Sequence, residues 1–196
     1  MVDAGIMTFT TWPVRYAERI QLPVPFSWPV RTVNLKRCLD VERIPVEGSE
    51  KELVLVNLHL EAYDDGEGKA EQTKMLRDLL QEEAEKGNYV IAGGDLNQTF
   101  SNVDSSRYPT LEDRWQPGII DTSEFGNGWQ FIMDTAVPSC RSLDQPYDGA
   151  DTENFQYYLI DGFIVSDNIA VDECRAKDLR FENSDHEPVL MTVRLL

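Results

Sequence analysis

The segment from Leu53 to Glu61 alternates between apolar and polar side chains, the two-residue period of a β-strand with one buried face. Its apolar positions are Val54, Val56, Leu58 and Leu60. The intervening positions carry Asn57, His59 and Glu61. The pattern therefore predicts a strand that presents polar side chains, including an imidazole, where it ends.

A helical period follows this strand. Apolar side chains recur three or four residues apart, at Met75, Leu76, Leu79, Leu80 and Ala84. Asp64-Asp65-Gly66 offers a turn before them and Gly87 a stop after them, so we expect a helix from Gly68 to Lys86. The short apolar run 89–92 predicts a buried strand next. Strand, helix and strand in this order indicate a right-handed crossover between parallel strands.

Residues 98–155 are rich in Gly, Pro, Asp and Ser, with one short apolar stretch at 129–133, and we expect long loops over a site. Trp115, Trp129, Arg141 and Tyr147 are candidate substrate contacts there, although aromatic side chains in loops more often pack against the protein body. Three further strands are predicted at 157–165, 169–175 and 189–195, the first two joined by the turn 166–168.

Length and composition favour one domain over 1–196, with a substantial core. No stretch approaches the ~20 consecutive apolar residues that cross a bilayer, and the first residues lack a signal-peptide pattern, so we expect a cytoplasmic protein without a membrane span. Cys38, Cys140 and Cys174 are widely spaced and odd in number, which predicts free thiols rather than a cysteine-rich zinc site.

The formal net charge is −17. Residues 1–52 carry seven basic and seven acidic side chains, so the rest of the chain holds the whole excess. A surface of this kind repels long polyanions and disfavours sequence-independent DNA binding. The first segment still allows a local basic patch, from Arg15, Arg19, Arg31, Lys36 and Arg37, although scattered basic residues are more often solvated surface.

Three polar clusters lie at expected strand ends. The chain has only two histidines, His59 in the first cluster and His186 in Ser184-Asp185-His186-Glu187-Pro188, and the third cluster is Gly93-Gly94-Asp95-Leu96-Asn97. Side chains from separate strand ends converge in open α/β folds. Carboxylates to hold a divalent cation and activate water, imidazoles to handle protons and an amide to orient a substrate together suit phosphate-ester hydrolysis. Each cluster alone is also compatible with a turn, a helix cap or a structural histidine.

In this order the motifs VNLHL, GGDLN, LIDGFIVS and SDHEPV resemble those of the endonuclease/exonuclease/phosphatase superfamily, and GIMTFTTWPV is similar to an earlier strand and turn of that family. The resemblance runs from about Gly5 to the C-terminus. It implies an α/β (α+β) fold of two packed mixed β-sheets flanked by helices, a deoxyribonuclease-like sandwich.

The resemblance also implies roles for individual residues. His186 would contact the scissile phosphate or handle the proton of water, and Asp161 would orient it. Asp95 would position or deprotonate the attacking water, Asn97 would steady the phosphate, and His59 would donate a hydrogen bond to phosphate oxygens. The implied metal ligands for Mg²⁺ (or Mn²⁺) are Asp185, Asp95 and Asn97.

The family pattern is incomplete in this chain. The family's first strand, with its Asn, and a later Glu that is its principal metal ligand both precede the segment similar to Gly5–Val14, and neither is found. The chain therefore resembles the C-terminal portion of an N-terminally truncated family domain. We expect weak metal binding, and a homo-oligomer in which strands pair between chains.

Two hypotheses about function follow. The first is a metal-dependent phosphoesterase acting on a small or lipid-linked phosphate ester rather than on long nucleic acid. The alternative is a catalytically silent remnant of the family that serves as a binding or assembly module, because the principal metal ligand is missing.

Overall fold

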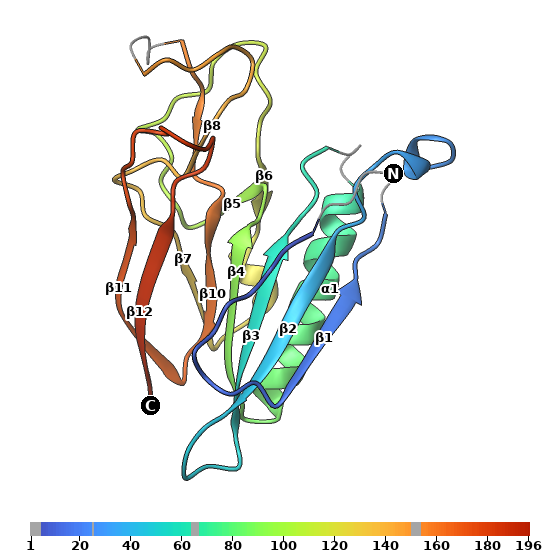
Figure 1. The fold of residues 1–196 in the computed structure, drawn as a ribbon, viewed down its shortest axis with the longest axis vertical. Coiled ribbons are helices and arrows are strands. Elements are labelled where there is room, and N and C mark those ends of the chain that lie inside the picture. Colours follow the sequence, from blue (N-terminus) through green and yellow to red (C-terminus); the bar gives the residue numbers. More distant parts are fainter. Residues whose placement is uncertain (1–4, 25, 64–66, 150–153) are drawn as a thin grey trace.

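A six-stranded mixed sheet forms the centre of the protein in the computed structural model, which describes residues 5–24, 26–63, 67–149 and 154–196 (Figure 1). The strand order is β1-β2-β3-β4-β10-β7. The bounds are Tyr16–Gln21 for β1, Cys38–Pro45 for β2, Glu52–His59 for β3, Tyr89–Asp95 for β4, Asp161–Ser166 for β10 and Trp129–Ile132 for β7. Strands β3 and β4 are parallel, and the other neighbours are antiparallel.

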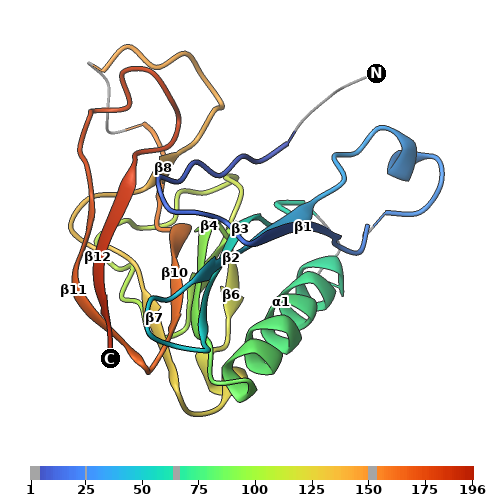
Figure 2. The ribbon, with the colours of Figure 1, turned by 60° about the horizontal axis from the view of Figure 1, so that its bottom comes forward.

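Helix α1, Glu67–Glu85, connects β3 to β4 and covers one face of this sheet (Figure 2). The apolar positions expected on one face of β3 all join the core that contains Leu76 and Leu80 of the helix. Both the crossover and the helix are confirmed, with the helix displaced by one residue from its expected bounds. The side chains that alternate with the core positions therefore project from the opposite face of the sheet.

An antiparallel pair of strands, β11 (Ile169–Ala176) and β12 (Val189–Leu195), packs on that opposite face. Ile169, Val171, Met191 and Val193 form a second core with residues of the large sheet that include Ile91 and Phe163. The molecule thus has three layers: helix, sheet and strand pair, as Figure 2 shows. The mixed α+β class is confirmed, but the second sheet is a small antiparallel pair and not a second mixed sheet.

The region expected to be loops contains several short elements. These are β5 (Gln98–Phe100), β6 (Gly118–Ile120), η2 (Thr122–Phe125), β7 and β8 (Cys140–Arg141). A further short helix, η1, spans Val30–Thr32. The strand predicted at 157–165 is interrupted. Strand β9 covers only Tyr157–Tyr158, and the Ile160 carbonyl accepts a hydrogen bond from the Leu96 amide before β10 begins.

The segment Gly5–Val14, expected to include a strand, contains none. Its polar contacts run to side chains of β2 and β3 instead of to a neighbouring backbone. Thr8 Oγ1 donates to Asp40 Oδ2 at 2.9 Å, and Asn57 Nδ2 donates to the Met7 carbonyl at 3.2 Å. The segment is therefore held across the sheet as extended chain.

Among the described residues, β12 pairs with β11 along one edge and has no strand on its other edge. Pairing between chains stays a prediction, which light scattering would test. No helix in the described ranges is long and apolar enough to cross a membrane. The turn expected at 64–66 lies outside the described residues.

Candidate active site

Three polar side chains form a row across neighbouring strands, on the sheet face opposite α1. In the strand register His59 of β3 is opposite Asp95 of β4, and Asp95 is opposite Asp161 of β10. His59 Nε2 lies 3.2 Å from Asp95 Oδ2. Residues directly opposite one another have Cβ atoms about 5 Å apart and share a sheet face. The register alone therefore brings one imidazole and two carboxylates together.

Gly94 permits the approach of β4 to β3 beside this row. Its φ is +142°, and a Cβ at this position would lie 2.1 Å from the Leu58 carbonyl oxygen. Any other residue would have to displace β3 or adopt a strained backbone. The glycine before Asp95 is thus a requirement of the His59–Asp95 contact.

His186 reaches the row from the segment before β12. Its Nδ1 lies 2.9 Å from Asp161 Oδ2, and its Nε2 lies 3.8 Å from Asp95 Oδ2. An isolated antiparallel bridge pairs the backbone of His186 with that of Cys140 in β8. The imidazole is consequently fixed both by a carboxylate and by its own backbone.

Asn97 fixes the orientation of Asp95. The backbone N–H of Asn97 donates to Asp95 Oδ1 at 2.8 Å, in a tight turn with φ of +49° at Asn97. Its side-chain Nδ2 donates to the Leu60 carbonyl at 2.9 Å and lies 3.3 Å from Asp95 Oδ2. Both oxygens of the carboxylate are therefore held in place.

The surroundings of Asp95 disfavour its negative charge. Burial, followed by repulsion from Asp161, raises the pKa of Asp95 to about 6. The carboxylate is therefore mostly ionised at pH 7 but close to its titration range, which is the condition under which a carboxylate is an efficient general base.

The two histidines have opposite shifts. Burial, together with the positive charges of Arg37 and His186, lowers the pKa of His59 to about 4. Burial lowers the pKa of His186, but its hydrogen bonds with Asp161 and Cys140 and the negative charge of Asp161 outweigh burial and raise the pKa to about 11. At neutral pH the site thus contains a neutral His59 and a positively charged His186.

Two of the expected metal ligands contact each other, and the third lies in a group that includes His186. Asp95 and Asn97 contact each other, whereas Asp185 forms a group with Cys140 and His186 whose potential ligand atoms all lie within 4.8 Å of one another. This group could hold a metal ion. Mg²⁺ prefers oxygen ligands, so a thiol and an imidazole fit it poorly.

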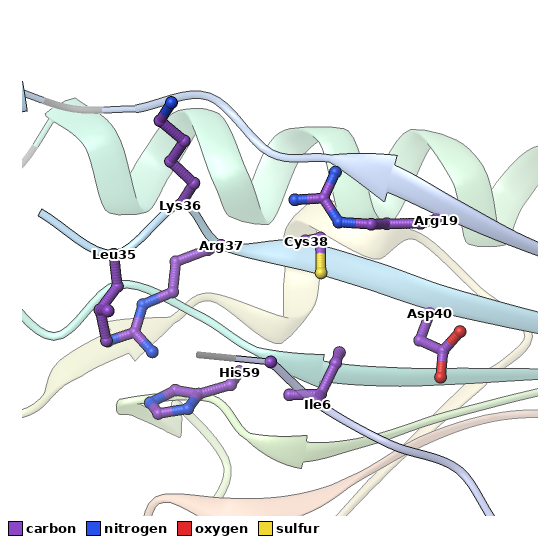
Figure 3. Close-up of a pocket in the computed structure, with 9 residues that line it drawn as sticks. Ile6, Arg19, Leu35, Lys36, Arg37, Cys38, Asp40 and His59 are labelled. Atoms are coloured by element: carbon purple, nitrogen blue, oxygen red, sulfur yellow. The ribbon is translucent and has the colours of Figure 1, made fainter. Parts of the chain in front are cut away.

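A cavity of about 340 Å³ adjoins the row at His59. Arg19 of β1, Lys36, and Arg37 just before β2 contribute three positive charges to its lining (Figure 3). Asp40 is the carboxylate of the lining, and Ile6 and Leu35 are its aliphatic side chains. Three of the five residues of the possible basic patch thus gather beside a candidate catalytic histidine, despite the net charge of −17.

Sequence reasoning missed two contributors to the site. Cys140 was expected to be a free thiol, and this is confirmed. Its contact with His186 could not be predicted from the positions of the cysteines in the sequence. Ser139 Oγ accepts hydrogen bonds from the Ile160 and Asp161 amides, so it secures the start of β10.

The four candidate loop contacts are occupied by packing. Trp115 stacks edge-on against Tyr158, and Arg141 lies over the ring of Tyr147 at 4.3 Å. Trp129 belongs to β7 and packs against the main core. Packing within the protein therefore accounts for the positions of all four side chains.

No protein-family model and no curated protein matches the sequence. Solved structures are similar in fold. An endonuclease/exonuclease/phosphatase from Beutenbergia cavernae DSM 12333 matches 94% of this chain and 46% of its own, with a TM-score of 0.59 and 17% identity. The human Nocturnin catalytic domain matches 94% of this chain and 60% of its own, with a TM-score of 0.55 and 14% identity.

TDP2 from D. rerio, solved with a single-strand DNA product, has a TM-score of 0.55 and 18% identity over 92% of this chain and 68% of its own. The chain spans about half the length of the Beutenbergia structure, at 46%, and of TDP2 from Caenorhabditis elegans, at 49%. At these identities the likeness concerns the fold. The protein has the fold of the endonuclease/exonuclease/phosphatase superfamily.

Proposed function

We propose that the protein hydrolyses phosphate esters by attack of an activated water molecule. The observation that carries the proposal is the contact chain from Asp161 through His186 and Asp95 to His59, in which one positively charged imidazole lies beside a carboxylate that titrates near neutrality. The fold shared with an endonuclease/exonuclease/phosphatase supports it.

Asp95 is the general base in this proposal. Its carboxylate accepts a proton from water as the water attacks phosphorus, and Asn97 keeps the carboxylate in place. The positive charge of His186, fixed by Asp161, stabilises the negative charge that develops on the phosphate oxygens. Neutral His59, whose Nε2 lies 3.2 Å from Asp95 Oδ2, flanks the second oxygen of the base.

Dependence on Mg²⁺ or Mn²⁺ belongs to the same proposal. Asp185 and Asp95 are the side chains that would hold the ion, and a bound cation would neutralise phosphate charge. The mixed ligand types around Asp185 lead us to expect weak binding.

The substrate we propose is a small phosphate ester with a second anionic group, either a phosphate or the head group of a lipid. Arg19, Lys36 and Arg37 line the cavity beside His59 and would bind that second group. The excess of acidic side chains elsewhere repels long nucleic acids. A volume of about 340 Å³ is within the range of small-ligand sites.

The direct test is hydrolysis of bis(p-nitrophenyl) phosphate with Mg²⁺, with Mn²⁺ and with a chelator. We expect metal-stimulated release of nitrophenol that falls by a factor of about 10² to 10⁴ in His186→Ala. Asp172→Asn is the control, because Asp172 is an exposed residue of β11 that pairs with Arg194. Equal rates in the wild type, His186→Ala and the chelated sample would reject hydrolysis.

The cavity has a separate test. Adenosine 3′,5′-bisphosphate should bind at least tenfold more tightly than adenosine 5′-monophosphate in the presence of chelator, and Lys36→Ala should remove the difference. Arg175→Ala, in β11, is the control. Equal affinities for the two nucleotides would contradict the substrate class without bearing on hydrolysis. A folded protein that binds but never hydrolyses would favour the binding-module alternative.

A further inference from the structure

We propose that Cys140, His186 and Asp185 form a binding site for a thiophilic divalent cation of the Zn²⁺ class. The bound ion would be coordinated by the imidazole of His186, which belongs to the candidate active site. The three side chains offer one sulfur, one nitrogen and one oxygen atom, all within 4.8 Å of one another. Zn²⁺ commonly takes this combination of ligands.

The backbone holds these residues together before any ion binds. Cys140 and His186 face each other in an antiparallel bridge. On one side of the bridge the Glu187 amide donates to the Ser139 carbonyl at 2.8 Å, and on the other the Arg141 amide donates to the Asp185 carbonyl at 3.0 Å. The two ligand side chains thus start from fixed and adjacent positions, which lowers the ordering cost of binding.

The orientation of His186 suits metal binding. Its Nδ1 lies 2.9 Å from Asp161 Oδ2, which leaves Nε2 as the ring nitrogen available to a metal ion. A carboxylate that accepts from the second ring nitrogen is the usual companion of a metal-bound histidine, because it fixes the ring and raises the basicity of the ligand nitrogen.

The chemistry of the three ligands selects the ion. Thiolate and imidazole favour Zn²⁺ and softer cations, whereas Mg²⁺ requires an octahedron of oxygen atoms. Tetrahedral zinc with bonds of about 2.0 to 2.3 Å needs ligand atoms roughly 3.3 to 3.8 Å apart. The three ligand atoms now lie within 4.8 Å of one another, so metal binding would draw them closer together.

Metal binding at this site releases protons, and their number can be measured. The thiol of Cys140 loses its proton to become the thiolate ligand, and Nε2 of His186 gives up any proton that it carries, so the protons pass to the buffer. Once the ion is coordinated by Nε2, His186 can no longer supply a proton or its positive charge to a phosphate. On the proposed function, Zn²⁺ therefore inhibits hydrolysis.

Cadmium provides a probe that does not depend on activity, because a cadmium–thiolate bond absorbs in the ultraviolet. Titration of the reduced, chelator-treated protein with Cd²⁺ should produce this absorption with one equivalent, and Cys140→Ser should lose it. Cys174→Ser is the matched control, because Cys174 lies in β11, away from the site. Asp185→Asn should weaken binding at least tenfold and keep the absorption.

Calorimetry of the unaltered protein keeps the test valid if a variant misfolds. Zn²⁺ should bind at least a hundredfold more tightly than Mg²⁺, and the heat should depend on the ionisation enthalpy of the buffer because protons are released. Comparable affinities for the two ions, or a cadmium absorption that Cys140→Ser retains, would overturn the site. Neither result requires a substrate, so failure of this proposal is distinct from failure of the hydrolytic one.

Discussion

Two clusters of acidic and basic side chains lie on opposite faces of the same sheet, and they differ in how their charges are paired. On the helix side, Glu83 of α1 accepts from both Nη atoms of Arg43 at 2.8 Å and from Lys86 and Asn88. The first of these bonds, that with Arg43, lowers the pKa of Glu83 to about 2, against the opposing effect of burial.

On the other face, Asp95 and Asp161 lie side by side with a neutral histidine between Asp95 and the basic cavity. Burial, and after it the negative charge of Asp161, raise the pKa of Asp95 to about 6. The same functional group is thus strongly stabilised as an anion in one cluster and destabilised in the other. The neighbours, and not the residue type, separate a carboxylate that stabilises the fold from one suited to proton transfer.

The largest expected effect is the loss of hydrolysis in Asp95→Asn. The amide keeps the shape and the hydrogen bond from the Asn97 amide but cannot accept a proton, so kcat should fall by a factor of about 10² to 10⁴. At pH 8 the variant should also be about 1 kcal/mol more stable than the wild type, because the unfavourable charge is gone. Urea unfolding and hydrolysis rates check both; an active or a markedly destabilised variant would contradict the comparison.

The same change in the other cluster should do the reverse. Glu83→Gln removes the closest anionic partner of Arg43 and leaves only Glu52, at 3.5 Å, so we expect a loss of about 3 kcal/mol in the free energy of unfolding. The rate per folded molecule should stay within a factor of about two, since Glu83 lies on the helix side of the sheet. A large decrease in kcat with unchanged stability would show that the two faces are coupled.

The pH dependence separates the two carboxylates further. For hydrolysis, kcat/KM should fall about tenfold per pH unit below pH 6, where Asp95 becomes protonated, and should level off above pH 7. For stability, the pKa of Glu83 is lowered on folding, so its contribution is present above about 4.5 and is lost as the pH falls toward about 2.

The contribution of Asp95 to the free energy of unfolding depends on pH in the opposite direction. Its pKa is raised on folding, so its contribution is present below about 4 and is lost as the pH rises through about 6. Unfolding curves of the wild type and of Asp95→Asn between pH 3 and pH 8 should therefore diverge with rising pH. Parallel curves would exclude a raised pKa.

The smallest effect is expected from an exposed pair on the same helix. Lys74 contacts Asp78 four residues along α1, and both side chains are more than half exposed. Lys74→Ala should change the free energy of unfolding by no more than about 0.5 kcal/mol. A loss as large as that in Glu83→Gln would mean that exposure does not explain the difference between paired charges.

The sequence predicted those parts of the site that depend on strand periodicity. Alternation in β3 places His59 on the face opposite Leu58, and the parallel crossover then sets it opposite Asp95. The six-stranded order was not readable, because β7 and β10 meet across a region whose composition is that of loops. Loop-like composition indicates solvent exposure but does not exclude a strand, because a short edge strand such as β7 is stabilised by the strand with which it pairs.

Contacts between distant loops were also beyond local patterns. Nothing near Cys140 in the sequence indicates that it faces His186, since the bridge depends on where β8 and the segment before β12 meet in space. The strand expected in Gly5–Val14 was wrong for a related reason: the side chains of Asn57 and Asp40 provide its hydrogen bonds. Roles inferred from motif resemblance stay predictions until the variants above are measured.

Gly94 limits how this site can be altered. With the Leu58 carbonyl only 2.1 Å from where a Cβ would be, even alanine must separate β3 from β4 or shift the carboxylate that follows. A library that diversifies the surroundings of Asp95 to change its chemistry should therefore leave this position untouched. Every replacement there would alter spacing before it altered reactivity.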